Sequence, residues 1–266
     1  MSLFRNLLIC VMFCLLAACG STAASTGGSD DATSGDSSSD GSGDTAGGLT
    51  IAGVWSSTFG GYSEISTTAW DDATIVKLDA AGRTAIVQNP ATAKYNPSQF
   101  SKLAWTAPAS GSFYYCTVDY GLATAELASA TTKTADDSAP DKSGCGGFPW
   151  TKLTAAAPIA IAGKYNDNFG GKSVISSRYW DASWLYQFDN TKRFAILQAA
   201  ADDKYNPSKF SKVLWTAPAS GSFYSCTIDY GLDSAALALA STLTADDSAP
   251  DKSGCAGFSW TTLTPQ

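Results

Sequence analysis

The sequence predicts a mainly β protein that consists of two tandem copies of one small antiparallel domain. Residues 51–154 align with residues 161–264 without a gap, and about six in ten aligned positions are identical. Within each copy, short runs of alternating hydrophobic and polar residues are separated by Gly, Pro, Asn and Asp, which is typical of antiparallel strands. Each copy also contains two cysteines at matching positions. We therefore expect two barrel-like or sandwich domains, each with one short helix and one disulfide.

The composition and charge of the chain exclude several kinds of site. The 266 residues include no histidine, which excludes a Ser-His-Asp triad, a Cys-His pair and a histidine-bound metal. Five of the 24 acidic residues and one of the 17 basic residues lie before residue 49, so the two copies are nearly balanced in charge. A nucleic-acid groove needs a basic stripe that displaces counterions. We therefore expect no nucleic-acid partner.

Residues 1–18 have the pattern of a secretory signal, in which Arg5 precedes an apolar run too short to span a bilayer. The run ends in Leu16-Ala-Ala-Cys19, which resembles the lipobox of bacterial lipoproteins. The resemblance implies that Cys19 becomes the acylated N-terminus and anchors the protein to membrane lipid. Because Gly20 follows, and not an aspartate, the family pattern implies the outer membrane, with the protein facing the periplasm or the exterior. The alternative is a plain signal peptide with a chance cysteine.

Residues 19–48 are interpreted as the lipidated cysteine and a flexible tether. This segment is rich in Ser, Gly, Thr, Ala and Asp and contains no aromatic residue, so it cannot bury enough apolar surface to fold. The duplication sets the remaining boundaries: a first domain at 49–154, a linker at 155–160 and a second domain at 161–266.

The strands of the first copy are expected at 51–55, 63–67, 74–78, 83–88, 100–106, 113–118 and 148–153, and those of the second copy at the matching positions. Residues 79–82 predict a hairpin loop, and the alanine- and leucine-rich residues 122–131 predict the short helix. The opening Gly53-Val-Trp55, followed by a meander, loosely resembles the start of a lipocalin. That resemblance implies a barrel, and a smaller open barrel or a sandwich with one packed helix is the alternative.

A comparison of the two copies predicts which strand faces are buried. One face of the sixth expected strand is apolar in both copies: Tyr114, Cys116 and Val118 match Tyr224, Cys226 and Ile228. We expect this face to point inward, and we expect Tyr115, which matches Ser225, to face solvent. In another strand the two copies differ in size: Thr74, Val76 and Leu78 match Trp184, Tyr186 and Phe188. If that face points inward, the first copy either repacks or encloses a cavity.

Four of the seven cysteines lie in the repeats, and they permit three pairings. Each copy is expected to close on itself, which selects Cys116–Cys145 and Cys226–Cys255. Export to an oxidising compartment favours disulfides. Free buried thiols or a metal pair are the alternatives, but two cysteines without histidine make a poor zinc site. We therefore expect neither a metal nor another cofactor.

Candidate ligand-binding residues are aromatic side chains that recur in both copies and have polar neighbours. Aromatic faces that border a groove can stack on sugars or grip peptides. Trp105 and Trp150 lie on faces expected to be inward, so we assign them to the core. Trp70 and Trp180 each follow a turn and precede an aspartate, so they are the better candidates for exposed indoles, with a core position as the alternative. The remaining candidates lie at a turn in each copy: Tyr95, Asn96, Tyr205 and Asn206.

Two patterns of acidic residues are candidates for a calcium site and for a hydrolytic site. Calcium prefers six to eight oxygen ligands, and one loop carries Asp136, Asp137 and Asp141, repeated as Asp246, Asp247 and Asp251. The spacing fits no EF-hand, which favours a polar loop. The second pattern would serve hydrolysis by paired carboxylates. Its candidate residues are Asp71, Asp79, Asp119 and their copies Asp181, Asp189 and Asp229. No sequence feature links any two of them.

We therefore expect a non-catalytic binding module, lipid-anchored in the cell envelope, for a glycan, peptidoglycan or a protein partner. A structural envelope lipoprotein without a specific ligand and a carboxylate-dependent glycoside hydrolase are the alternatives.

Overall fold

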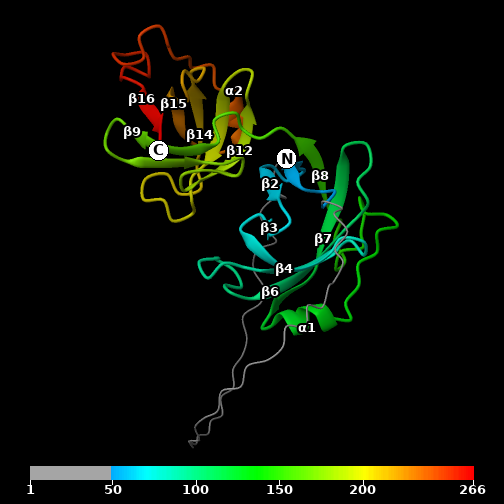
Figure 1. Ribbon diagram of the computed structural model, residues 1–266. Helices are drawn as coiled ribbons and strands as arrows, with labels where there is room; N and C mark the ends of the chain where they lie inside the picture. The colour runs from blue at the N-terminus through cyan, green and yellow to red at the C-terminus, as the bar shows by residue number, and fades with distance from the viewer. Residues whose placement is uncertain (1–48) are drawn as a thin grey trace, which may run out of the picture. The chain divides into compact units, whose positions relative to one another are not determined.

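The computed structural model describes residues 49–266, so the predictions for the signal segment, for lipidation of Cys19 and for the tether lie outside it. The described residues form two closed eight-stranded antiparallel barrels in tandem (Figure 1). Each strand pairs with its neighbours in sequence and the last strand pairs with the first, which is an up-and-down topology. The predicted class is confirmed, and the form is a barrel, not a sandwich. Within residues 49–266, every helix is too short or too polar to cross a membrane.

The element bounds are nearly the same in the two copies. Barrel 1 consists of β1 (Gly53–Ser57), β2 (Tyr62–Ile65), β3 (Ala69–Trp70), β4 (Ala73–Asp79), β5 (Thr84–Gln88), β6 (Phe100–Trp105), β7 (Ser112–Leu122), α1 (Ala125–Ala130) and β8 (Thr151–Ala156). Barrel 2 consists of β9 (Gly163–Asp167), β10 (Lys172–Ile175), β11 (Tyr179–Trp180), β12 (Ser183–Asp189), β13 (Phe194–Gln198), β14 (Phe210–Trp215), β15 (Phe223–Leu232), α2 (Ala235–Ala240) and β16 (Thr261–Pro265). The strands missed by the prediction are β3 and β11, because two residues are too few to show an alternation.

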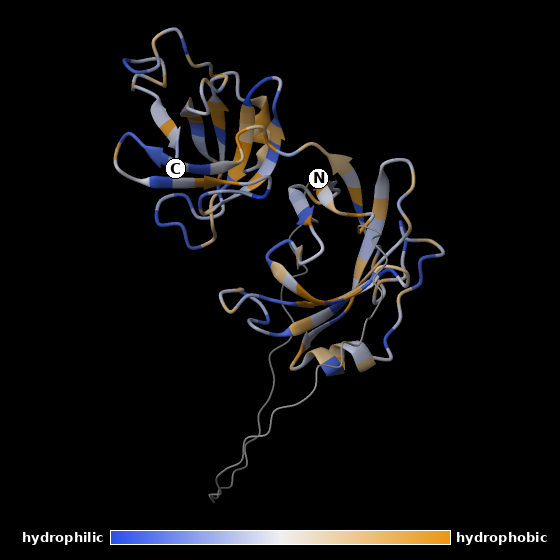
Figure 2. Ribbon diagram, viewed as in Figure 1, coloured by the Kyte–Doolittle hydropathy of each residue, from blue (hydrophilic) through white to orange (hydrophobic). Residues whose placement is uncertain are grey.

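Large side chains fill the interior of each barrel. In barrel 1 the buried interior residues include Trp55, Trp70, Leu103, Trp105, Phe113 and Leu153. The interior of barrel 2 is built from the matching positions. Hydrophobic positions alternate with polar ones along the strands (Figure 2), as expected when every second residue points into a barrel.

The prediction of which face of the sixth expected strand points inward is wrong. This strand is β7 in barrel 1 and β15 in barrel 2. Phe223 is 1% exposed and lies in the interior of barrel 2. Cys226 is also buried, but it belongs to a separate cluster with Ile228 and Trp260. In barrel 1, Phe113 and Tyr115 likewise pack against the interior. Both faces of the strand are covered, so apolar character could not distinguish the inside from the outside.

Of the three positions that differ in size between the copies, only Leu78 and the matching Phe188 pack against the barrel interiors. Register shifts occur between Ile75 and Lys77 of β4 and between Leu185 and Gln187 of β12. A bulge of this kind moves the following side chains to the other face of the sheet. Ile75 and Leu78 therefore both pack against the interior, whereas Thr74 and Val76 are exposed.

Both predicted disulfides are present, with Cα–Cα distances of 5.5 Å for Cys116–Cys145 and 5.6 Å for Cys226–Cys255. They join β7 and β15 to the loops that precede β8 and β16. Gly144, beside the first bridge, has φ 103°, and a Cβ there would lie 1.8 Å from the Asp136 carbonyl oxygen. The loop therefore requires glycine at this position.

The acidic loop is ordered by its own hydrogen bonds. Asp136 accepts from the Ser138 N–H at 3.0 Å, and Asp141 accepts from the Tyr114 hydroxyl at 2.6 Å. The Trp150 indole N–H donates to the Asp136 carbonyl at 3.0 Å. Among residues 49–266, no group of three or more acidic or cysteine side chains is arranged to hold a metal ion. These contacts agree with the interpretation as a polar loop.

The predicted helix is shorter than residues 122–131. The Thr124 side chain caps α1 by accepting from the Leu127 N–H at 3.2 Å, which satisfies one free donor of the first turn. Helix α1 lies against β5, β6 and β7 (Figure 1), and Ala128 is fully buried there.

The connection between the barrels is anchored at both ends, so the predicted linker at 155–160 is too long. Ala155 and Ala156 belong to β8. Ile159 is 2% exposed and packs into the interior of barrel 2, and its N–H donates to the Ser177 hydroxyl at 3.1 Å. Both barrels belong to one compact unit, in which β2 contacts β12.

Candidate functional site

A pocket of about 680 Å³, which we call the mouth pocket, opens where the β3–β4 corner and the β5–β6 loop of barrel 1 meet. These two connections lie at the same end of the barrel because all strand pairs are antiparallel. The volume is within the range of small-molecule sites. The lining includes Trp70, Asp71 and Asp72 from the corner, Asn89, Lys94 and Tyr95 from the loop, Ser101, Leu103, Tyr115 and Thr117 from β6 and β7, and Tyr179 from barrel 2.

Asp71 shapes the β3–β4 corner. Its backbone is left-handed, with φ 57°, which aspartate tolerates better than most residues. Its carboxylate accepts from the Glu64 N–H at 3.0 Å and from the Ser63 hydroxyl at 3.3 Å. Asp181 makes the matching bonds in barrel 2, to Val174 N–H at 2.8 Å and the Ser173 hydroxyl at 3.1 Å. The corner is therefore a structural feature of both barrels.

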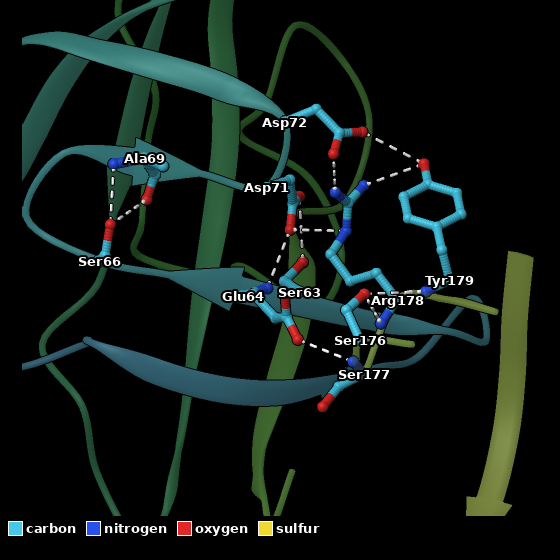
Figure 3. A network of polar contacts seen from close by, with 10 residues as sticks. All are labelled: Ser63, Glu64, Ser66, Ala69, Asp71, Asp72, Ser176, Ser177, Arg178 and Tyr179. Atoms are coloured by element: carbon cyan, nitrogen blue, oxygen red, sulfur yellow. Dashed lines mark hydrogen bonds and ion pairs between the residues drawn. The ribbon is translucent and has the colours of Figure 1, made fainter. Parts of the chain in front are cut away.

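In barrel 1 the corner also binds a guanidinium from barrel 2 (Figure 3). Arg178 Nε lies 3.2 Å from Asp71 Oδ1, and Arg178 Nη1 lies 2.6 Å from Asp72 Oδ1. The Tyr179 hydroxyl donates to Asp72 Oδ2 at 3.2 Å. The Arg178 side chain is 13% exposed, so its guanidinium is largely shielded from water, whereas the Asp72 side chain is 54% exposed.

Two groups of the pocket have shifted pKa values. Burial raises the pKa of the Asp71 carboxyl, and Arg178 offsets this rise only in part. Burial also raises the pKa of the Tyr115 hydroxyl, and the neighbouring Asp71 charge adds to the rise. The Tyr115 hydroxyl is therefore neutral at physiological pH.

The β5–β6 loop forms the exposed rim of the pocket. The Asn89 side-chain amide donates to the Asn96 carbonyl at 3.1 Å, which closes the loop on itself. Lys94 Nζ lies 5.4 Å from the centroid of the Tyr95 ring, and the Tyr95 side chain is 72% exposed. An aromatic face is thus available to a ligand at the entrance.

Trp70 and Trp180, the candidates for exposed indoles, take the core alternative instead, since they are 4% and 7% exposed. The short strand β3 pairs with both β2 and β4 and aims the Trp70 indole inward. Its ring centroid lies 5.3 Å from that of Tyr115 and 5.8 Å from that of Trp105. Trp70 nevertheless lines the mouth pocket, so it remains a candidate as part of the pocket floor. Trp105 and Trp150 are buried, as predicted.

The turn candidates have different surroundings. Tyr95 and Tyr205 are exposed. Asn96 Oδ1 lies beside Gly121 of β7, where a Cβ would approach it to 3.2 Å, and Asn206 lies in the same way beside Gly231. Asn96 is absent from the pocket lining, so its contacts indicate a role in packing the loop onto the barrel.

Sequence reasoning missed Asp72, Asn89, Tyr115 and Tyr179 as site residues. Their common signal is divergence between the copies, because the matching residues are Ala182, Ala199, Ser225 and Ala69. From the sequence, the change from Tyr115 to Ser225 predicts a solvent-facing position. In the structure Tyr115 lines the mouth pocket. A pocket lining accepts either a tyrosine or a serine, as a solvent-exposed surface does.

The carboxylates considered for hydrolysis lie apart from one another. Asp79 accepts from the Gly82 N–H at 2.8 Å and stabilises its hairpin. Asp119 pairs with Lys133 Nζ at 2.6 Å and with the Thr131 hydroxyl at 2.7 Å, and these bonds lower its pKa. Asp71 is the member of the three that lines the mouth pocket, and its oxygens are engaged by Ser63, Glu64 and Arg178.

Comparisons of the chain with protein-family models, with curated proteins and with solved structures gave no match.

Proposed function

We propose that the protein binds a neutral glycan in the mouth pocket of barrel 1 and does not transform it. The observation that carries this proposal is the mixed lining of the pocket, which combines aromatic rings with side chains that can form hydrogen bonds to hydroxyl groups. Trp70, Tyr95 and Tyr115 contribute aromatic atoms to the lining, and Asn89 and Asp72 contribute polar atoms. Aromatic rings with a few convergent polar groups are suited to the apolar faces and hydroxyl rims of sugar rings.

The charges of the site favour a neutral ligand. The pocket contains the carboxyl groups of Asp71 and Asp72 and the ammonium group of Lys94. Arg178, which is paired to both carboxylates, brings the formal charges into balance. A strongly charged ligand would find no uncompensated partner among these groups, whereas sugar hydroxyls can donate to a paired carboxylate.

Binding without catalysis fits the contacts of the two carboxylates. Paired-carboxylate hydrolysis needs one carboxyl group as an acid and another as a base or nucleophile on opposite sides of the scissile bond. Asp71 and Asp72 are adjacent in sequence and both contact the same guanidinium. Activity that disappears on an Asp71→Asn or Asp72→Asn change would favour the hydrolase alternative.

A protein partner is the second candidate, because large aromatic side chains are exposed at matching positions of both repeats. Phe59 and Phe169 are 71% and 75% exposed, and Phe148 and Phe258 are 64% and 76% exposed. Exposed aromatics are enriched at protein interfaces. A structural role without a specific ligand is the remaining alternative.

A glycan array that includes peptidoglycan fragments tests the proposal, followed by calorimetry on three variants. Tyr115→Ser installs the residue that barrel 2 carries, and Tyr95→Ala removes the exposed ring. Both should weaken binding at least tenfold with the fold retained. Tyr205→Ala, the matched control in barrel 2, should change the affinity little because Ser225, Ala199 and Ala182 replace polar groups of the pocket. No retained glycan at high micromolar concentration would reject the proposal in favour of a structural role.

We further propose that the protein is lipid-anchored in the envelope through Cys19, on the strength of the lipobox resemblance. Cys19→Ala should move the protein from the membrane fraction to the soluble fraction. Mass spectrometry of the native N-terminus checks the acylation directly, and an unacylated terminus would contradict it.

A further inference from the structure

The barrels contact one another at positions where the two copies differ. Glu64 and Asp72 of barrel 1 match Val174 and Ala182, and Arg178 of barrel 2 matches Thr68. Each of these charged residues has a partner in the other barrel: Glu64 Oε1 accepts from the Ser177 N–H at 2.8 Å, and Arg178 pairs with Asp72. Conversely, Val174 and Thr68 are exposed. The contact therefore uses side chains that only one copy has.

The backbone of barrel 1 also approaches barrel 2 closely. The Gly61 N–H donates to the Tyr186 carbonyl at 2.9 Å. A Cβ at Gly61 would lie 2.2 Å from the Trp184 ring, whereas a Cβ at the matching Gly171 would meet the side chain of its own neighbour Asp167. The larger aromatic residues of β12 thus pack against the β1–β2 turn of barrel 1.

The contact and the mouth pocket share residues. Asp71 and Asp72 line the pocket and bind Arg178, and Tyr179 lines the pocket while its hydroxyl binds Asp72. Arg178 also lies over the Tyr179 ring, with 4.9 Å between the guanidinium carbon and the ring centroid. Barrel 2 therefore contributes Tyr179 to the lining of the barrel 1 pocket, and its Arg178 pairs with two of the lining carboxylates.

We propose that the second repeat completes the binding site of the first, and that Arg178 is the positioning residue. It holds the Asp71 and Asp72 carboxylates at the pocket wall, neutralises them, and fixes Tyr179 at the rim. This inference rests on the proposed function for the identity of the ligand, but its structural part stands on the contact alone.

The physical reason is electrostatic and geometric. Without Arg178, two neighbouring carboxylates would face one pocket, and Asp71 is largely buried. A buried carboxylate without a partner is costly, so the corner would rearrange or take up a proton. Asp72, which is 54% exposed, would be free to turn to solvent. The pocket would lose both its neutral wall and the Tyr179 side chain.

The experiment uses Arg178→Thr and Asp72→Ala, which install the residues of the matching positions Thr68 and Ala182. Lys209→Thr is the control, since it removes an ion pair to Asp233 in which both side chains are far more exposed. Amide exchange measured by NMR at Ser177 and Gly61 reports the contact without any ligand. The Val174 amide, bonded within barrel 2 to Asp181, is the internal reference.

We expect Arg178→Thr to accelerate exchange at Ser177 and Gly61 by about tenfold or more relative to Val174. The Trp70 indole and Tyr115 resonances should shift, and affinity for the neutral trisaccharide tri-N-acetylchitotriose should fall at least tenfold. Asp72→Ala should act in the same direction with a smaller effect. The double variant should be no worse than Arg178→Thr alone, because the two residues share one interaction.

Unchanged exchange in Arg178→Thr, or faster exchange with unshifted Trp70 and Tyr115 resonances, would overturn the inference. If Arg178→Thr does not fold, the same comparison on Asp72→Ala decides it. Failure of the wild-type protein to bind tri-N-acetylchitotriose would count against a chitin-like glycan in the proposed function, while the exchange and resonance data would still decide the role of Arg178.

Discussion

Tyr62 of barrel 1 stacks on Phe188 of barrel 2, with ring centroids 4.4 Å apart and an angle of 29° between the ring planes. Tyr62 packs against the interior cluster of barrel 2, and its hydroxyl accepts from the Phe188 N–H at 3.3 Å. The matching residues in the other copies are Lys172 and Leu78. This pair is the apolar part of the contact whose polar part is the Arg178 network.

Tyr62→Lys, which installs the residue of barrel 2, should lower the unfolding free energy by about 2–4 kcal/mol. It removes a stacked pair, worth roughly 0.5–1.5 kcal/mol, together with roughly 1.5–3 kcal/mol from burial of a large apolar side chain. Tyr62→Phe keeps the ring and loses one acceptor, so about 1 kcal/mol is expected. Urea denaturation measures both values. Lys172→Tyr is the control, and an effect as large as that of Tyr62→Lys would count against this account.

Trp70→Ala and Trp180→Ala should each destabilise the protein by about 3–5 kcal/mol, because each removes a buried indole from a barrel interior. Tyr95→Ala should stay within about 0.5 kcal/mol of the wild type, because the side chain is exposed. Thermal unfolding distinguishes the two kinds of position. Equal effects for Trp70→Ala and Tyr95→Ala would show that the indole is not part of the core.

The pH dependence of stability should change when Arg178 is removed. Because the pKa of Asp71 is raised in the folded state, its contribution is fully present below the unfolded pKa of about 3.9 and is lost as the pH rises through the folded pKa. Arg178→Thr removes the charge that opposes the rise, so the folded pKa should increase further. Each added unit should cost about 1.4 kcal/mol at neutral pH.

Urea midpoints between pH 4 and 8 measure this effect. The difference between wild type and Arg178→Thr should grow with pH from about 4 upward. The other charged and titratable groups near Asp71 are Asp72, Tyr115 and Tyr179, and burial raises the pKa values of both tyrosines above their usual range. In Arg178→Thr/Asp71→Asn the additional slope should vanish. A slope that persists in this double variant would assign the effect to another group.

Removing the disulfide Cys116–Cys145 by a double alanine substitution should lower stability by roughly 3–4 kcal/mol, the chain-entropy value for a loop of this length. The same change at Cys226–Cys255 should cost a similar amount, because both pairs have a sequence separation of 29. Calorimetric melting of each variant tests the expectation. A large inequality between the two variants would show that the loops contribute differently to the two barrels.

The local features of the fold were predictable because they depend on residues close in sequence. The strand ranges, the hairpin at Asp79 and the short helix follow from alternation, turn residues and a segment rich in alanine and leucine. The disulfide pairing followed from the duplication, which requires each copy to close on itself. The position of Trp70 was not predictable, because a two-residue strand shows no period, and its burial depends on pairing with β2 and β4.

The sequence by itself determined that this protein is a tandem duplication of one β domain, with one internal disulfide in each copy. Only the tertiary structure decided that the strands close into barrels, that Phe113 and not Cys116 faces the interior, and that Arg178 reaches Asp71 and Asp72. The physical reason is that both faces of β7 are covered, so its polarity pattern is ambiguous. The contact between the repeats joins residues more than 100 positions apart, and no local pattern encodes such a pairing.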